Sequence, residues 1–293
     1  MRKKAGGPGA DGQHAEHFAR ELDATLARLR SRLLDGSYRP GPLLRRALVK
    51  PDGGERLLAV PTLTDRVVQT ATHNALARAF DRDFSTASFA YRPRLAVELA
   101  LARVVALRLW GFGFVVDADI RRFFDEVSHE RLLNDLEKRL NDRRILALIA
   151  QWLAAFGGEF GLAQGAPISP FLANLFLDPV DKAIESKSVR LVRYADDLLL
   201  LCRSAAKAGR ALDRLAALLA DRGLRLHETK TRLTTFDEGF DFLGYRFEGP
   251  SLFRPEALPS CPAKSSPNEL SREMPAAAAA APNCSISTDD GKG

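Results

Sequence analysis

Two aspartates stand side by side between apolar runs, at positions that suit metal-assisted chemistry. Asp196 and Asp197 lie within Arg193–Leu200, whose other residues are mostly apolar. Adjacent carboxylates repel each other and are costly to remove from water, so an arbitrary pair of this kind is usually a solvated hairpin tip. A divalent cation gives the other explanation, because magnesium prefers hard oxygen ligands. The pair is therefore either a solvated turn or half of a metal site.

A second acidic segment closes another apolar run. Asp117 and Asp119 end the strand-like stretch Gly113–Ile120, and alternation along a strand places both carboxylates on one face. Either aspartate could therefore meet the Asp196-Asp197 turn on a neighbouring strand. Two magnesium ions about 3.5–4 Å apart, bridged by such carboxylates, stabilise the attacking and leaving oxygens of nucleotidyl transfer. Together the two segments predict a nucleotide-polymerising site.

The elements that must position these acids alternate between helical and strand-like patterns. Apolar residues recur at helical spacing in ranges 13–34, 64–80, 96–110, 129–156, 170–186 and 205–222. Asn141-Asp142 is expected to divide 129–156, and Pro179 to kink or divide 170–186. Strand patterns occupy 44–60 (a hairpin), 113–120, 189–202 (a hairpin), 224–226 and 240–247. This order predicts an α+β fold, with helices packed against a mixed or antiparallel sheet.

Composition excludes several other classes of protein. The 293 residues carry 43 Lys+Arg against 37 Asp+Glu, and this charge of +6 is compatible with a polyanionic partner without requiring one. The three cysteines lack the spacing of a zinc site or a disulfide framework. No apolar run is long enough for a membrane span, and the N-terminus lacks a signal-peptide pattern. We therefore expect a cytoplasmic protein with no membrane partner.

The aspartate motifs resemble those of bacterial reverse transcriptases related to group II introns. The tetrad Tyr194–Asp197 is similar to the catalytic turn of that family. The segment Asp119–Asp125 is similar to the first palm motif, an aspartate followed five positions later by an aromatic residue. The resemblance implies that Asp119, Asp196 and Asp197 are the catalytic residues and bind two Mg²⁺ ions.

The same palm motif implies two further assignments. Its spacing selects Asp119 over Asp117 as the metal ligand, and it makes Phe124 the steric gate. In the family, this ring blocks a ribose 2′-OH, so that deoxynucleotides are preferred.

Three further segments resemble substrate-binding motifs of the family. The loop that begins at Gln164 and Gly165 is implied to contact the incoming nucleotide, although such a loop can equally be an ordinary cap on a core helix. Lys50 and Arg56, on either side of a predicted turn, are implied to neutralise triphosphate oxygens. Lys230 is implied to lie near the leaving pyrophosphate. For these basic residues the alternative is a solvated side chain beside a turn or strand end.

The motifs follow the family order across residues 5–248, which implies the fingers and palm of a right-hand polymerase. Residues 1–88 are expected to form an N-terminal extension and fingers, and 89–248 the palm, with about 135–165 belonging to the fingers. Residues 249–293 are rich in Pro, Ser and Ala, so we expect a disordered tail there. Relatives usually continue into a helical thumb, which this composition does not resemble.

The resulting hypothesis is an RNA-directed DNA polymerase that extends a DNA primer on an RNA template with dNTPs. A second class stays open: a nucleic-acid-binding or assembly subunit that keeps the polymerase fold but has little independent activity. The intact aspartates favour the enzyme, whereas the thumb-less tail favours the subunit. We expect the setting to be CRISPR spacer acquisition or a group II intron, with an integrase or a structured RNA as partner.

Overall fold

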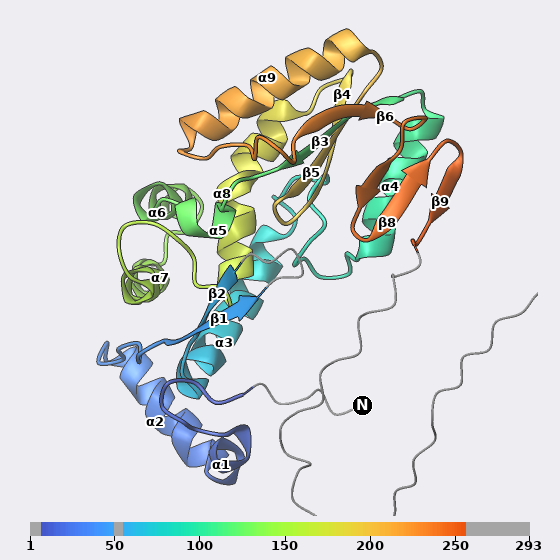
Figure 1. The fold of residues 1–293 in the computed structure, drawn as a ribbon. Helices are drawn as coiled ribbons and strands as arrows, with labels where there is room; N and C mark the ends of the chain where they lie inside the picture. Colours follow the sequence, from blue (N-terminus) through green and yellow to red (C-terminus); the bar gives the residue numbers. More distant parts are fainter. Residues whose placement is uncertain (1–6, 50–54, 256–293) are drawn as a thin grey trace, which may run out of the picture. The chain divides into compact units, whose positions relative to one another are not determined.

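A computed structural model of the chain describes residues 7–49 and 55–255, and the chain divides into two units, Met1–Arg254 and Pro255–Gly293. The helices are α1 (Ala15–Arg20), α2 (Leu22–Leu34), α3 (Leu63–Phe80), α4 (Val97–Leu109), α5 (Phe123–Glu126), α6 (His129–Glu137), α7 (Arg143–Phe156), α8 (Ser169–Ile184) and α9 (Ala205–Asp221). The strands are β1 (Leu44–Val49), β2 (Glu55–Val60), β3 (Phe114–Asp119), β4 (Val189–Tyr194), β5 (Asp197–Cys202), β6 (Arg232–Thr235), β7 (Phe240–Phe242), β8 (Tyr245–Glu248) and β9 (Ser251–Phe253). Figure 1 shows their arrangement.

The acidic segments lie on a four-stranded sheet with the order β4-β5-β3-β6. All three strand pairs in it are antiparallel, and helices pack against it, so the predicted α+β fold is confirmed. β4 and β5 form a hairpin in which Tyr194 pairs with Asp197, leaving Ala195 and Asp196 as the turn. Because β3 lies between β5 and β6, neighbours on both sides fix its register.

The two faces of this sheet belong to separate apolar clusters. Val116 and Leu200 pack with side chains of α8 and α9 on one face, which we call the α8 face. Val115 and Leu199 pack with side chains of α4 and of the β7–β8 hairpin on the other, which we call the α4 face (Figure 1). Side chains alternate along a strand. Asp119, at an odd-numbered position of β3 like Val115, therefore lies on the α4 face.

Several elements differ from the sequence-based expectation. The helix predicted over 13–34 is divided at Glu21 into α1 and α2. Of the two alternatives at Pro179, division of the helix is wrong, because α8 runs through this residue and is buried on most sides, while a kink there stays a prediction. The strand predicted over 224–226 is an isolated bridge between Leu226 and Ile120. Regular structure also continues past Gly249 into β9, which pairs with β8.

In the described ranges, no helix combines the length and the apolarity needed to cross a bilayer.

A buried polar network joins the N-terminal part of the chain to α3 and α7. The Tyr38 hydroxyl donates to Asp65 Oδ1 at 2.5 Å and accepts from Trp152 Nε1 at 3.1 Å. The other Asp65 oxygen accepts from the Gly41 N–H and the Thr62 hydroxyl. Burial, and then the hydrogen bond to Asp65, raise the pKa of Tyr38 well above its usual value. The phenol therefore stays neutral and remains a donor.

Substitution Tyr38→Phe is expected to lower the free energy of unfolding by about 1–3 kcal/mol, because it leaves buried partners on Asp65 and Trp152 without their hydrogen bonds. Urea denaturation followed by circular dichroism measures the change. Tyr245→Phe is the matched control, since no hydrogen bond to the Tyr245 hydroxyl is seen in the described residues. Equal stability of the two variants would contradict the network's contribution.

Candidate active site

The strand register brings the predicted catalytic aspartates together. Asp119, the last residue of β3, pairs with Asp197, the first residue of β5. Asp196 precedes Asp197 in the two-residue turn. Asp117 pairs with Leu199, which lies two residues further from the turn than Asp197. The end of β3 and the start of β5, about 80 residues apart in sequence, thus bring Asp119 and Asp197 together, with Asp196 beside Asp197 in the turn.

Negative charge accumulates at this point. The pKa of the Asp197 carboxyl is raised to about 6, first by desolvation and then by the charges of Asp196, Asp119 and Asp117, while Lys230 opposes the rise. Asp197 nevertheless keeps access to solvent. The site therefore carries an excess of negative charge at a solvent-accessible position, which a bound cation would neutralise.

Two basic side chains approach the acids from the segment that follows α9. Lys230 Nζ lies 3.1 Å from Asp119 Oδ2, and Arg232 Nε lies 3.1 Å from Asp117 Oδ2. The His227 N–H donates to the Asp119 carbonyl at 2.8 Å, which anchors this segment to the end of β3. Burial raises the pKa of Asp117, and Arg232 opposes that rise. Each of the two aspartates thus has a basic partner, and of the two only Asp119 pairs directly with Asp197 beside the turn.

The donor set suits a hard dication, because it consists of carboxylate oxygens at the ends of rigid strands. In the arrangement described, no three His, Cys, Asp or Glu side chains of residues 7–49 and 55–255 converge closely enough to coordinate an ion. Positive charge at Asp119 comes instead from the Lys230 ammonium. The binding of two Mg²⁺ ions by Asp119, Asp196 and Asp197 therefore stays a prediction.

Phe124 lies five residues beyond Asp119, in the short helix α5. Its ring is half-buried and packs edge-on against Phe123, with ring centroids 5.5 Å apart. Its carbonyl accepts from the Leu162 N–H at 2.6 Å. The preceding Arg122 adopts a left-handed conformation with φ 44°, which turns the chain sharply after β3. These contacts fix the Phe124 main chain, so the ring has a defined position near the strand end.

The predicted nucleotide loop lies against the fingers hairpin. The Ala59 N–H of β2 donates to the Gln164 carbonyl at 2.7 Å. Gly165 has φ 116°, and a side chain there would bring a Cβ to 3.3 Å from the Ala59 carbonyl oxygen. A glycine is therefore required both by the backbone conformation and by the close approach. The loop couples the β1–β2 hairpin to the start of α8.

The two basic fingers residues are only partly covered by the structure. Arg56 lies in β2, where it pairs with Leu48 of β1. Lys50 lies outside the described residues, between β1 and β2. Their predicted contacts with triphosphate oxygens stay predictions.

Arg193 is a residue whose role at the site the sequence analysis missed. It belongs to β4, immediately before the acidic tetrad's tyrosine, and its side chain is 1% exposed. It forms an ion pair with Asp181 of α8 and donates to the Ala195 carbonyl in the turn. The available signal was an arginine directly after the apolar pair Leu191-Val192 in a strand expected to be buried, because a charged residue is buried only with a partner.

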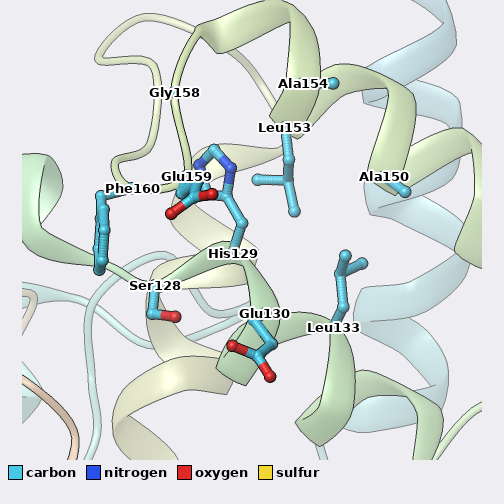
Figure 2. A pocket seen from close by; sticks show the side chains of 10 residues that line it. All are labelled: Ser128, His129, Glu130, Leu133, Ala150, Leu153, Ala154, Gly158, Glu159 and Phe160. Carbon is cyan, nitrogen blue, oxygen red and sulfur yellow. The ribbon is translucent and has the colours of Figure 1, made fainter.

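Two surface hollows lie elsewhere, between α6 and α7. One has a volume of about 360 Å³, and Figure 2 shows Leu133 and Leu153 in it beside the carboxylates of Glu130 and Glu159. The other, of about 530 Å³, shares Leu133 with it. Neither is lined by any of the predicted site residues. The two hollows therefore belong to a different part of the surface from the candidate site.

The antiparallel sheet, with aspartates at the ends of its central strands, is the arrangement expected from the sequence for a polymerase palm. Residues 48–247 match the model of the family described as reverse transcriptase (RNA-dependent DNA polymerase). The chain belongs to this family.

Two relatives of known name are similar in sequence to the chain. Protein YkfC of Escherichia coli (strain K12) is 29% identical over 292 residues, which cover 83% of this chain and 76% of YkfC. The group II intron-encoded protein LtrA of Lactococcus lactis subsp. cremoris is 28% identical over 174 residues, which cover 56% of this chain and 29% of LtrA. The chain thus matches most of YkfC but less than a third of LtrA.

A solved structure supports the fold alone. Telomerase from Candida albicans, in complex with a fragment of telomeric RNA, superposes with a TM-score of 0.54 at 13% identity, covering 83% of this chain and 50% of that one. At this identity the likeness concerns the arrangement of elements and carries no inference about ligands.

Substitution Asp197→Asn is expected to stabilise the chain in the absence of divalent ions. The native carboxyl has a pKa of about 6 against an ordinary value of 3.8, so the folded state binds the proton more tightly. Stability therefore falls as pH rises through this interval and stays lower above it. Asparagine removes this loss. Thermal unfolding in a chelator should show the variant melting above the parent at pH 7.5, with the difference vanishing below pH 4.

Asp213→Asn, on the exposed side of α9, is the matched control and should leave the melting temperature unchanged at both pH values. A parent chain that is more stable than Asp197→Asn at pH 7.5 without metal would show that the like charges do not strain the site.

Proposed function

We propose that the chain is an RNA-directed DNA polymerase that extends a DNA primer on an RNA template, with Asp119, Asp196 and Asp197 as its catalytic and metal-binding residues. The observation that carries the proposal is the pairing of Asp119 with Asp197 at the ends of two central strands, beside Asp196. Family membership supports the same reaction.

The candidate residues would have different roles in this reaction. The carboxylates would hold two Mg²⁺ ions, and such ions supply stabilisation of the attacking and leaving oxygens. Lys230 would neutralise charge that develops on the leaving pyrophosphate, and its contact with Asp119 at 3.1 Å supports this role. The Gln164-Gly165 loop, Lys50 and Arg56 would bind the nucleotide from the fingers side. Phe124 would select its sugar.

A second function, a binding or assembly subunit with little activity of its own, uses the same fold. The accumulation of charge that raises the pKa of Asp197 favours the enzyme, because it disfavours the metal-free state and a purely structural turn does not require it. Two settings fit a polymerase similar to a group II intron protein: the intron itself, and CRISPR spacer acquisition beside an integrase. The genes that neighbour this one distinguish the two settings.

Asp196→Ala is expected to reduce magnesium-dependent primer extension by at least about 100-fold, because it removes a group that stabilises transition-state charge. Extension of a DNA primer on an RNA template measures the loss, and circular dichroism reports the fold. Asp237→Ala, which removes an exposed aspartate near the β6–β7 connection, is the control and should extend normally. Near-parental turnover by the Asp196 variant would refute the catalytic assignment.

Phe124→Ala is expected to raise the ratio of ribonucleotide to deoxynucleotide incorporation by roughly 10-fold or more, since removing one apolar group from a pocket changes discrimination by that order. Competitive incorporation on one template gives a ratio that does not depend on the fraction of active protein. Phe160→Ala, at an exposed phenylalanine of the α7–α8 connection, should leave the ratio unchanged. An unaltered ratio for both variants would make Phe124 a packing residue only.

A further inference from the structure

Arg193 is a buried cation on the face of the sheet opposite the carboxylates. It alternates with Val192 and Tyr194 of the α4 face, so its side chain enters the α8 face. There its Nε and Nη2 donate to the two oxygens of Asp181 at 2.7 and 2.6 Å. Both side chains are 1% exposed. Because desolvation offsets much of the attraction in such a pair, stability alone is a weak explanation for it.

The remaining contacts of the guanidinium reach α8 a second time and two other segments. Nη1 donates to Asn174 Oδ1 of α8 at 3.0 Å and to the Ala195 carbonyl at 2.9 Å. Nη2 donates to the Ser88 hydroxyl at 2.9 Å. One rigid planar group thus ties the catalytic turn to α8 and to the segment before α4. A lysine ammonium could not span these acceptors with the same geometry.

The main chain of Arg193 is held as well. Its N–H donates to the Ala87 carbonyl at 2.8 Å, and its carbonyl accepts from the Phe89 N–H at 2.9 Å. These bonds form a parallel bridge between Ser88 and Arg193. The backbone of Arg193 is therefore fixed independently of the turn, so that its guanidinium can hold the turn in place.

The contact with the Ala195 carbonyl is the one that affects the orientation of Asp196. Ala195 has φ 60°, a left-handed conformation that costs a residue with a Cβ roughly 1–2 kcal/mol and persists only when its surroundings impose it. Its carbonyl belongs to the peptide plane that continues into the Asp196 N–H. A bond that fixes this oxygen therefore fixes the orientation in which Asp196 leaves the turn.

We infer that Arg193 is a positioning residue, which holds the Ala195–Asp196 peptide so that the carboxylates of Asp196 and Asp197 meet Asp119 in the geometry that binds the catalytic cations. This inference rests on the proposed function, because it gives Arg193 the role of orienting the proposed metal ligands. Groups that orient metal ligands from behind typically change metal affinity or activity by roughly 10- to 100-fold when they are replaced.

The test compares Arg193→Lys with Arg190→Lys, a matched replacement on β4 at an arginine without an ion pair in the described residues. Binding of Mn²⁺ alone to each purified full chain is measured by electron paramagnetic resonance, and primer extension gives kcat and the KM for dNTP. Arg193→Lys should bind Mn²⁺ about 10-fold or more weakly and lose kcat by a similar factor, at an unchanged KM. Arg190→Lys should match the parent.

Parental Mn²⁺ affinity and kcat in folded Arg193→Lys would overturn the inference, and a lower melting temperature with no other change would mean that the pair is structural. If Arg193→Lys does not fold, Ser88→Ala removes one acceptor and leaves the ion pair. That variant should lose about 5-fold in kcat, on the scale of one hydrogen bond, and parental kcat there would equally overturn the inference.

Asp196→Asn, measured in the same assays, separates the two levels of the proposal. If that variant still extends primers and binds Mn²⁺ like the parent, the proposed active site itself is wrong. If it is inactive while Arg193→Lys behaves like the parent, the site stands and only the role of Arg193 falls.

Discussion

Mutual repulsion among aspartates is the constraint on which this structure turns. Four carboxylates lie at one end of a sheet that is apolar on both faces: those of Asp117, Asp119, Asp196 and Asp197. Because like charges repel, these side chains would not come together by themselves. The strands impose the meeting, because β3 is paired on both sides and cannot shift its register without exposing buried side chains. The apolar core thus supplies the energy that holds the charges together.

Positive charge enters this arrangement from two directions with different consequences. Lys230 approaches from the solvent side at 53% exposure, so it can exchange its partner when a substrate arrives. Arg193 is sealed on the α8 face and has two carboxylate oxygens of its own to neutralise it. Under the proposed function, the first cation would take part in the reaction, whereas the second would act only by positioning the turn. A flexible lysine suits a contact that has to change partners, whereas a planar arginine suits a contact that has to hold several acceptors in place.

Sequence reasoning reached the acids through local patterns and missed the interactions that orient them. Alternation along β3 placed Asp117 and Asp119 on one face, and the apolar runs around Asp196 predicted a hairpin, both of which the structure confirms. The register that sets Asp119 opposite Asp197 depends on contacts between segments about 80 residues apart, so no local pattern encodes it. The environment of Arg193 likewise depends on how α8 crosses the sheet. Packing on most sides keeps α8 continuous through Pro179, where propensity alone predicted a kink or a division.

The bridge between Ser88 and Arg193 has a consequence for the behaviour of the sheet in a crowded solution. β4 is an outer strand, and outer strands expose main-chain groups that can recruit strands from other molecules. At the end of β4 next to the acidic turn, the main-chain groups of Arg193 are already engaged by Ala87 and Phe89. Loss of this covering segment would therefore expose unpaired main-chain groups of β4 beside the acidic turn, and we expect the chain to self-associate through this strand.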